Sequence, residues 1–388
     1  MATATALPAF AMGPRPAMAQ SLGALGGVGD HVTRTSGASS SVVLIADPTL
    51  TALGFADRTI ADLKAAGHTP HLFDDFTSDP KEEAVNAALL LAQECDAGCI
   101  IGLGGGSALD LAKLVAGLAH KSTDCAPYRL SRVPIGRRLA AFIAVPTTSG
   151  TGSETTRTSI ISEDNGTKNW FFDDSLLPDL AVMDPELTVG LPGYWTLYTG
   201  LDALVHAVEA RTNRYRFPEN DAISDRAIEL VGLHLRPALE NPQNTIARAG
   251  LQRAAAYAGM AINNTGCAVA HNIGHALGSL AGVPHGRAVS IAMVKTLPWA
   301  IEGAPDAFDT VAKILRLEEP TALSHWMKDT AATLDETLHL TAAESAMVSV
   351  PALEASMLSS ANKAMLDSTA RTADPDDVLY LASTTLAS

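Results

Sequence analysis

The first half of the chain alternates short apolar runs with longer segments of helical spacing. Apolar runs at 42–46 (VVLIA), 99–103 (CIIGL) and 142–145 (FIAV) predict buried strands, and HLFDDF restarts another strand at residue 71. Residues 56–70 and 82–98 have helical spacing, and Gly67 closes the first of them. Strands that alternate with helices predict a parallel α/β sheet with crossover helices.

From Asp184 onwards the pattern becomes helical and strand signals are scarce. Residues 221–235 (DAISDRAIELVGLHL) carry an apolar stripe at helical spacing. Further helix starts are predicted at Pro305, at the Thr341-x-x-Glu344 capping box and at Asp374-Pro375. We therefore expect an α/β nucleotide-binding domain over residues 1–188 and an all-helical domain over residues 189–388.

Composition is that of a folded protein with more than one domain. A chain of 388 residues exceeds the size at which one core keeps growing, and 47% apolar with 18% charged residues excludes a disordered chain. The net charge of −15 argues against a nucleic-acid partner. No stretch approaches the roughly 18 to 20 apolar residues of a membrane helix, so no membrane association is expected.

The cysteines and the N-terminus point to a cytoplasmic protein. Four cysteines in a chain of this length do not make a disulfide framework, which fits a reducing compartment. Cys95 and Cys99 could pair as metal ligands, but burial is the favoured interpretation because Cys99 opens an apolar strand. Residues 17–20 (AMAQ) faintly resemble a cleavage site without the rest of a signal peptide, so we expect a frayed tail or a first strand there.

Two turns that follow predicted strands have the chemistry of ligand binding. Gly104-Gly105-Gly106-Ser107 comes directly after the strand at 99–103 and opens a helix, so its backbone N–H groups and the helix dipole can hold a pyrophosphate; a tight turn alone would also use such glycines. The hydroxyl and glycine run from Thr147 to Ser153 leads straight into Glu154 and a second strand, which favours a ligand-binding loop over a linker.

A short hairpin is predicted next. Asn165-Gly166 separates TSIIS from KNWFF, and this dipeptide is typical of a two-residue hairpin turn. The hairpin would point Lys168 back towards the same cleft, although on its own Lys168 is an ordinary surface lysine.

Histidines gather in one segment of the second half. His271 and His275 share one helix face, and His285 follows a Gly282-Val-Pro turn that can fold it back towards them. Asp202 and His206 form a second pair at the same spacing. One carboxylate and several imidazoles are typical ligands of a first-row divalent cation such as Fe(II) or Zn(II), whereas a lone histidine is more often a satisfied core residue.

Four motifs together resemble the iron-containing (group III) alcohol dehydrogenases. They are GGGSALDLAK, PTTSGTGSET, the Asp-x3-His of LDALVHAVE and the His-x3-His-x9-His of HNIGHALGSLAGVPHG, in the family's order over about residues 43–286. The resemblance implies a Rossmann-like parallel-sheet domain and an all-α metal-binding domain, the architecture shared with dehydroquinate synthases. It also implies that metal and nicotinamide meet between the two.

The resemblance assigns site residues by position. The implied metal ligands are Asp202, His206, His271 and His285. His275 matches the histidine near the nicotinamide rather than a ligand. The implied cofactor contacts are Asp47, Gly105, Gly106, Ser107, Asp110, Thr147, Thr148, Thr156 and Lys168. Asp47 also has a physical interpretation, because a carboxylate at a strand end can bind a ribose 2′-OH and repel a 2′-phosphate, favouring NAD over NADP.

The expected function is that of a metal-dependent alcohol dehydrogenase or aldehyde reductase. Hydride passes between the nicotinamide of NAD and a small alcohol or aldehyde, Fe(II) or Zn(II) activates the oxygen, and His275 relays a proton. A homodimer is also expected. Alternatives are relatives such as glycerol dehydrogenases, dehydroquinate synthases and maleylacetate reductases, or a metal- or nucleotide-binding protein without catalysis; the PTTSGTGSE loop and the filled ligand positions argue against them.

Substrate identity is less constrained by the sequence. Thr158, Ile262 and Cys267 match pocket-lining positions and suggest a modest, mainly apolar cavity. Arg157 and Arg287 could recognise a carboxylate or phosphonate, but an ion pair is the favoured interpretation of each.

Three places depart from the family pattern. Asn272 stands where glycine is usual, Val289 replaces an asparagine, and Ser78-Asp79-Pro80 replaces an Asn-Pro segment. These changes bear on substrate fit and cofactor affinity, since no ligand position is lost.

Overall fold

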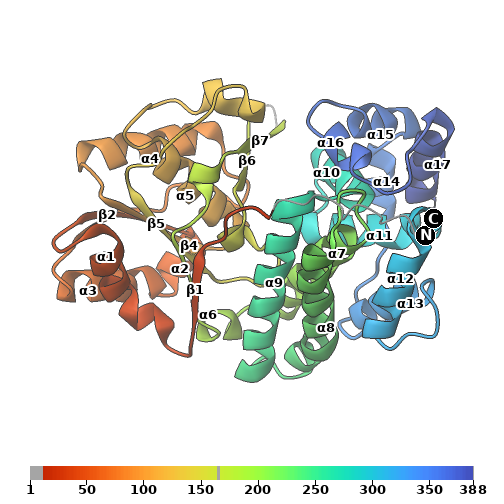
Figure 1. Ribbon diagram of the computed structural model, residues 1–388, viewed down its shortest axis with the longest axis horizontal. Coiled ribbons are helices and arrows are strands. Elements are labelled where there is room, and N and C mark those ends of the chain that lie inside the picture. Colours follow the sequence, from red (N-terminus) through yellow and green to blue (C-terminus); the bar gives the residue numbers. More distant parts are fainter. Residues whose placement is uncertain (1–11, 164–166, 388) are drawn as a thin grey trace, which may run out of the picture.

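A six-stranded parallel sheet forms the centre of the first half of the computed structural model, which describes residues 12–163 and 167–387 (Figure 1). Its strand order is β1-β8-β5-β4-β2-β3 and every pairing is parallel. The strands are β1 Ala17–Gln20, β2 Ser41–Ala46, β3 Thr69–Phe73, β4 Cys99–Gly104, β5 Ala141–Pro146 and β8 Leu180–Met183. The predicted parallel sheet is thus confirmed, and residues 17–20 are its edge strand.

Helices cover both faces of this sheet. They are α1 Val28–Ser36, α2 Pro48–Ala52, α3 Phe55–Ala65, α4 Glu82–Glu94 and α5 Gly106–Leu118, with 3-10 turns η1 Ala24–Gly27, η2 Ala126–Ser131, η3 Ser153–Thr155 and η4 Asp174–Leu176. In β2, Val43 faces a core with α4 and α5, whereas Leu44 faces a second core with α1 and α3. Successive strand residues point to opposite faces, so a run of apolar residues is needed where both faces are covered.

A two-stranded antiparallel ribbon lies beside α5. It consists of β6 Thr158–Ser162 and β7 Lys168–Phe172, with Ser162 opposite Lys168. The predicted hairpin pairing is therefore present, although its turn at Asn165-Gly166 lies outside the described residues.

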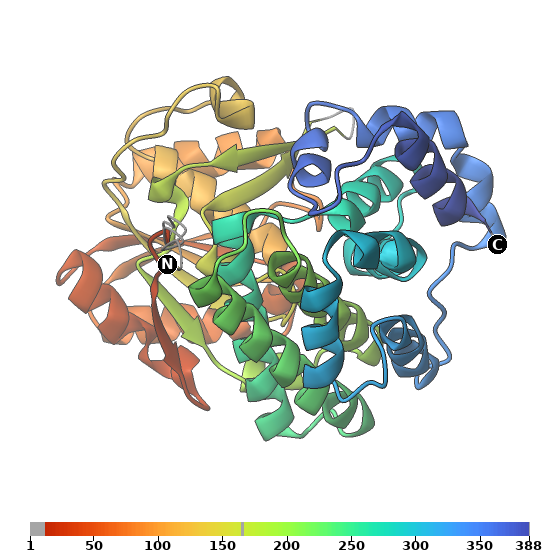
Figure 2. The ribbon, with the colours of Figure 1, turned by 45° about the vertical axis from the view of Figure 1, so that its right-hand side comes forward.

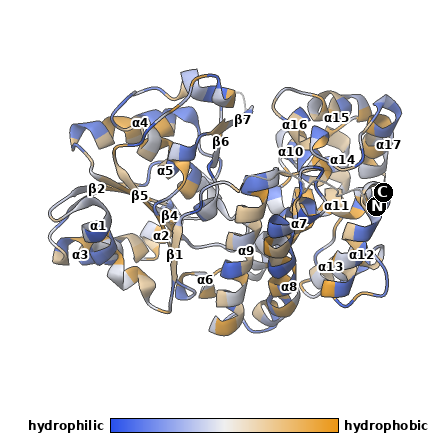
Figure 3. Ribbon diagram, in the orientation of Figure 1, coloured by the Kyte–Doolittle hydropathy of each residue, from blue (hydrophilic) through white to orange (hydrophobic). Residues whose placement is uncertain are grey.

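The second half is helical throughout the part that the structure describes, apart from an isolated bridge between Asn213 and Thr369. Its helices are α6 Glu186–Val189, α7 Gly193–Arg211, α8 Pro218–Glu240, α9 Thr245–Thr265, α10 Val269–Ala281, α11 His285–Gly303, α12 Pro305–Ile314, α13 Ala322–Ala332, α14 Ala342–Met347, α15 Val350–Met357, α16 Lys363–Asp367 and α17 Pro375–Leu386. The predicted capping box at Thr341 begins α14, and the predicted helix start at Asp374-Pro375 begins α17, where Asp374 and Asp377 form a second capping box. Hydrophilic and hydrophobic positions alternate along α8 and α9, as expected of helices that bury one face (Figure 3).

The central helix α7 packs against α8, α9 and α11, and α9 lies between the sheet and the remaining helices (Figures 1 and 2). Hydrogen bonds join the halves, including Gln20 to the backbone of Ala249 and Thr155 to the backbone of Ala256. None of the described helices is both long enough and apolar enough to cross a bilayer.

Candidate active site

Helix α7 supplies the first part of the site. Asp202 and His206 lie one turn apart, and Glu209 follows on the same face. Nearly all of α7 from Thr196 onwards is buried, so these polar side chains point into protein rather than solvent.

Helices α10 and α11 bring the other histidines to this face. His271 lies in the first turn of α10, and α11 begins at His285 after the turn at Gly282, whose φ is +66°. A Cβ on Gly286 would lie 2.3 Å from the carbonyl oxygen of Tyr198. Because Gly286 has no side chain, α11 can approach the backbone of α7 closely enough to place His285 beside Asp202.

The four predicted ligands come together in the structure. Each offers one ligand atom, and these atoms all lie within 4.8 Å of one another. His271 Nε2 and His285 Nε2 lie 3.6 and 3.4 Å from Asp202 Oδ1, and His206 Nδ1 lies 3.9 Å from Asp202 Oδ2. Asp202 Oδ1, His206 Nδ1 and His271 Nε2 are buried without a hydrogen-bond partner. Buried polar atoms are rarely left unpaired, so this set of three converging atoms fits a cation.

Protonation in this group suits metal binding. Burial lowers the pKa of His206 to about 4 and that of His285 to about 3, so both rings are neutral near pH 7. Burial would raise the pKa of Asp202, but the three imidazoles around it, led by His206, hold it below its usual value. Burial also opposes a charge on His271, yet Glu209 and Asp202 raise its pKa to about 9. Metal binding would displace that proton.

His275 lies next to the four ligands without joining their group. Its ring centroid is 5.3 Å from that of His285 and 6.3 Å from that of His271. Burial and the neighbouring rings hold the pKa of His275 well below its usual value, and the Lys168 ammonium contributes in the same direction. Lys168 lies on β7 and its Nζ lies 3.9 Å from Asp79 Oδ1, while its place in the cofactor cleft stays a prediction.

The glycine turn after β4 has the form of an anion site. Helix α5 begins at Gly106, and its N-cap Gly105 makes no side-chain cap, so the first backbone N–H groups have no capping side chain. An added Cβ would lie 3.3 Å from Thr148 at Gly105 and 2.8 Å from Thr151 at Gly106. The two predicted binding turns are thus packed against each other.

Several predicted cofactor residues have partners within the protein. Asp110 accepts hydrogen bonds from Ser153 Oγ and the Ile160 backbone, at 2.6 and 2.9 Å, and Thr156 Oγ1 accepts one from Lys113 Nζ at 2.8 Å. Their cofactor roles stay predictions. Their side chains also join α5 to the segment from Thr147 to Ser153 and the residues after it, and we call residues 147–153 the hydroxyl loop.

Of the remaining predicted cofactor residues described next, Asp47, Thr147 and Thr148 follow strand ends and Ser107 lies in the first turn of α5. Asp47 caps α2 by accepting from Thr49 N at 2.8 Å, and Ser107 Oγ donates to the carbonyl of Ser78. Thr147 N donates to the Gly104 carbonyl at 2.9 Å, and Thr148 is only partly buried. These four residues border the turn where β2, β4 and β5 end.

Residues assigned to substrate recognition divide into two sets. Thr158, Ile262 and Cys267 are partly buried. Arg157 pairs with Asp174 at 2.5 Å, and Arg287 pairs with Glu344 at 2.6 Å. The favoured interpretation of both arginines as ion pairs is confirmed.

Two of the three departures from the family pattern are explained by packing. Asn272 is fully buried and donates to the carbonyls of Met357 and Asn362, which ties α10 to the segment between α15 and α16. Val289 fills the space against Gly274 on the neighbouring helix.

Two charged residues were missed by the sequence interpretation. Glu209 accepts from His271 Nδ1 at 2.7 Å, and Lys113 is fully buried between Asp110, Thr156 and the carbonyl of Thr158. The signal for Glu209 was its position three residues after His206, on the ligand face of α7.

Comparison with known proteins agrees with this geometry. The family model "Iron-containing alcohol dehydrogenase" matches residues 16–185, and the model of the family's C-terminal region matches residues 196–384. A sulfoacetaldehyde reductase of Bilophila wadsworthia is 32% identical over 81% of this chain and 81% of its own length. Long-chain-alcohol dehydrogenase 1 of Geobacillus thermodenitrificans is 36% identical over 64% of each chain, so slightly less than two thirds of its length is matched.

Solved structures share the fold across the whole length. The crystal structure of a 1,3-propanediol oxidoreductase has a TM-score of 0.88 at 26% identity and covers 97% of this chain and 100% of its own. Membership of this family implies a nicotinamide cofactor and a metal. The family models, the relatives and the fold agree that this chain belongs to the iron-containing alcohol dehydrogenase family.

Proposed function

We propose that this protein is an NAD-linked alcohol dehydrogenase or aldehyde reductase in which Asp202, His206, His271 and His285 hold a divalent metal ion. The observation that carries the proposal is the convergence of these ligand atoms, three of them buried and unpaired, beside His275. Fe(II) is the proposed ion and Zn(II) the second candidate, because imidazole and carboxylate ligands suit both.

The chain's own residues supply binding and proton transfer. The N–H groups at the start of α5 hold the pyrophosphate, and Asp47 accepts from the ribose hydroxyl, which favours NAD over NADP. When bound, the ion would supply Lewis acidity towards the substrate oxygen and the nicotinamide would supply the hydride chemistry. His275 exchanges the hydroxyl proton through its ring nitrogen, and Lys168 on the sheet side limits its positive charge.

We propose that small neutral aldehydes and alcohols are the preferred substrates. Both arginines near the site already have carboxylate partners, so an anionic substrate group would have to compete for them. The sulfoacetaldehyde reductase among the relatives is named for an anionic aldehyde, so the test includes such compounds.

Larger-scale features are part of the same proposal. The domains are residues 1–188 and 189–388, and the compartment is the cytoplasm, in line with four free cysteines. A homodimer is also proposed, since β1 is an edge strand and the nearby side chains of Met18 and Leu22 are exposed. Sedimentation analysis measures the oligomeric state.

The test is anaerobic purification followed by metal analysis and a substrate panel. The Fe(II)-loaded protein is assayed with NADH and NADPH against neutral and anionic aldehydes, and the Asp202→Asn variant is the matched control. We expect one metal ion per chain, NADH-dependent reduction of neutral aldehydes, and loss of both in the variant. Tight cofactor binding without hydride transfer to any aldehyde would instead support a non-catalytic binding protein.

A further inference from the structure

We infer that Glu209 is a positioning residue for the metal centre, because it fixes both the His271 ring and the start of the helix that carries it. This inference rests on the proposed function, since it assumes that His271 is a metal ligand. Glu209 is not one of the four ligands, and it acts through His271.

Both oxygens of the Glu209 carboxylate accept hydrogen bonds from one short segment of the chain, residues 268–271. Oε2 accepts from the Ala268 backbone at 2.7 Å and from His271 Nδ1 at 2.7 Å. Oε1 accepts from the backbones of Ala270 at 2.6 Å and His271 at 3.3 Å. Glu209 is 2% exposed, so bulk solvent does not compete for these donors.

These contacts make Glu209 the cap of α10. The N-cap residue Ala268 has no side chain able to accept, so the orphan N–H groups of the first turn are satisfied from α7 instead. A negative charge at this end also complements the helix dipole. Glu209 therefore ties the helix that carries Asp202 and His206 to the helix that carries His271.

The same carboxylate selects the ring nitrogen that faces the ligands. Nδ1 donates its proton to Glu209, so the ring nitrogen whose lone pair can bind a metal is Nε2. Nε2 is buried without a partner and lies 3.6 Å from Asp202 Oδ1. A carboxylate on the remote nitrogen of a histidine ligand fixes the ring orientation and makes the ring a better electron donor.

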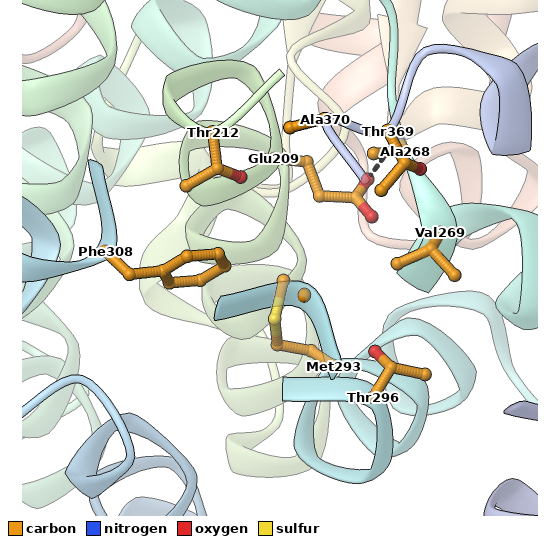
Figure 4. A pocket seen from close by; sticks show the side chains of 10 residues that line it. Glu209, Thr212, Ala268, Val269, Met293, Thr296, Phe308, Thr369 and Ala370 are labelled. Carbon is orange, nitrogen blue, oxygen red and sulfur yellow. Dashed lines mark hydrogen bonds between the residues drawn. The ribbon is translucent and has the colours of Figure 1, made fainter. Parts of the chain in front are cut away.

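The side-chain hydroxyls around Glu209 have hydrogen-bond partners of their own. A cavity of about 10 Å³, enough for roughly one water molecule, lies beside the carboxylate and is lined by Met293, Phe308 and Val269 together with three threonines (Figure 4). The three threonines are Thr212, Thr296 and Thr369, and each hydroxyl donates to a backbone carbonyl one turn earlier in the chain.

A role for Glu209 as a direct ligand is the alternative. Glu209, Cys267 and His271 also place ligand atoms within 4.8 Å of one another. Both carboxylate oxygens, however, accept two N–H bonds each, and burial raises the pKa of the Cys267 thiol well above its usual value. This second group therefore serves as the support of His271.

Co(II) affinity of the full-length protein tests the proposal, measured by competition with a chromophoric chelator and by the Co(II) absorption spectrum. We expect the Glu209→Gln variant to bind Co(II) about 10 to 100-fold more weakly than wild type, with NADH affinity unchanged. The control Asp374→Asn makes the same carboxylate-to-amide change at the cap of α17, outside the ligand group, and should keep wild-type Co(II) affinity. Equal Co(II) affinity in the Glu209→Gln variant and wild type would overturn the proposal.

Two further outcomes separate this inference from the proposed function. If wild type and the Asp202→Asn variant bind Co(II) equally weakly, the metal site itself is wrong. If the Glu209→Gln variant does not fold, histidine ¹⁵N spectra of the Zn(II)-loaded wild type decide the question. A His271 ring protonated at Nδ1 supports the inference, and metal on Nδ1 overturns it.

Discussion

The buried carboxyl of Glu154 predicts a pH-dependent stability that one amide substitution should remove. Glu154 is 2% exposed, and burial raises its pKa from 4.5 to about 7, with the Lys113 ammonium offsetting only part of this effect. Burial acts on Lys113 in the opposite direction and lowers its pKa to about 8.

The sign and size follow from proton linkage. A carboxyl with a higher pKa in the folded than in the unfolded protein contributes stability below pH 4.5, and this contribution is lost as pH rises through about 7. The full shift corresponds to up to about 3 kcal/mol, of which about 2 kcal/mol falls between roughly pH 5 and pH 7.5. In a chain of this length that difference amounts to about 3 °C in Tm.

The Glu154→Gln variant keeps the side-chain shape and removes the titration. Lys113 keeps Asp110 at 3.5 Å and the oxygen acceptors of Thr156 and Thr158. Thermal unfolding is followed by circular dichroism at about pH 5 and pH 7.5. The Tm of the variant minus the Tm of wild type should be about 3 °C larger at the higher pH. The Glu240→Gln control, exposed at the end of α8, should keep a constant difference. Identical pH dependence in wild type and the Glu154→Gln variant would refute the reasoning.

Three further predictions concern the site and its support. His275→Ala should lower kcat about 100-fold while metal analysis finds the ion retained; loss of the ion would mean that His275 is a ligand. Asp47→Ser keeps a cap for α2 but removes the charge, so initial rates should show a higher kcat/KM ratio of NADP to NAD, and an unchanged ratio would place the ribose contact elsewhere. Gly152→Ala should lower Tm because the new Cβ would lie 2.4 Å from the Ala255 carbonyl oxygen. Gly136 has a similar positive φ but lies in open space, so the Gly136→Ala control should lower Tm by less.

Local chemistry made much of the fold predictable. The continuous apolar run of β2, the hairpin ribbon, the capping box of α14 and the Asp374-Pro375 start of α17 are each determined by neighbouring residues, and the structure confirms them. The position of β8 between β1 and β5 was not predicted. A four-residue strand has little periodicity, and the order of a parallel sheet depends on long crossovers rather than on local sequence.

In the site, spacing predicted the two pairs of side chains, and the turn before His285 together with the family resemblance predicted that they meet. Helical periodicity places Asp202 with His206, whereas their meeting with His285 depends on the contact of Gly286 with α7. Glu209 and Lys113 were missed because an acidic or basic residue in a helix is usually solvated, and only the tertiary structure shows that these two are buried.

The hydroxyl loop shows why small residues are required between the halves. A Cβ on Gly150 would lie 2.7 Å from Thr199 Cβ on α7, the helix that also carries His206. The same loop contacts the glycine turn through Thr148 and Gly105. One loop thus contacts both the helix that carries Asp202 and His206 and the proposed pyrophosphate site. Because hydride transfer needs reacting atoms within about 3 to 3.5 Å, we expect that a side chain at Gly150 would disturb the spacing between the two sites.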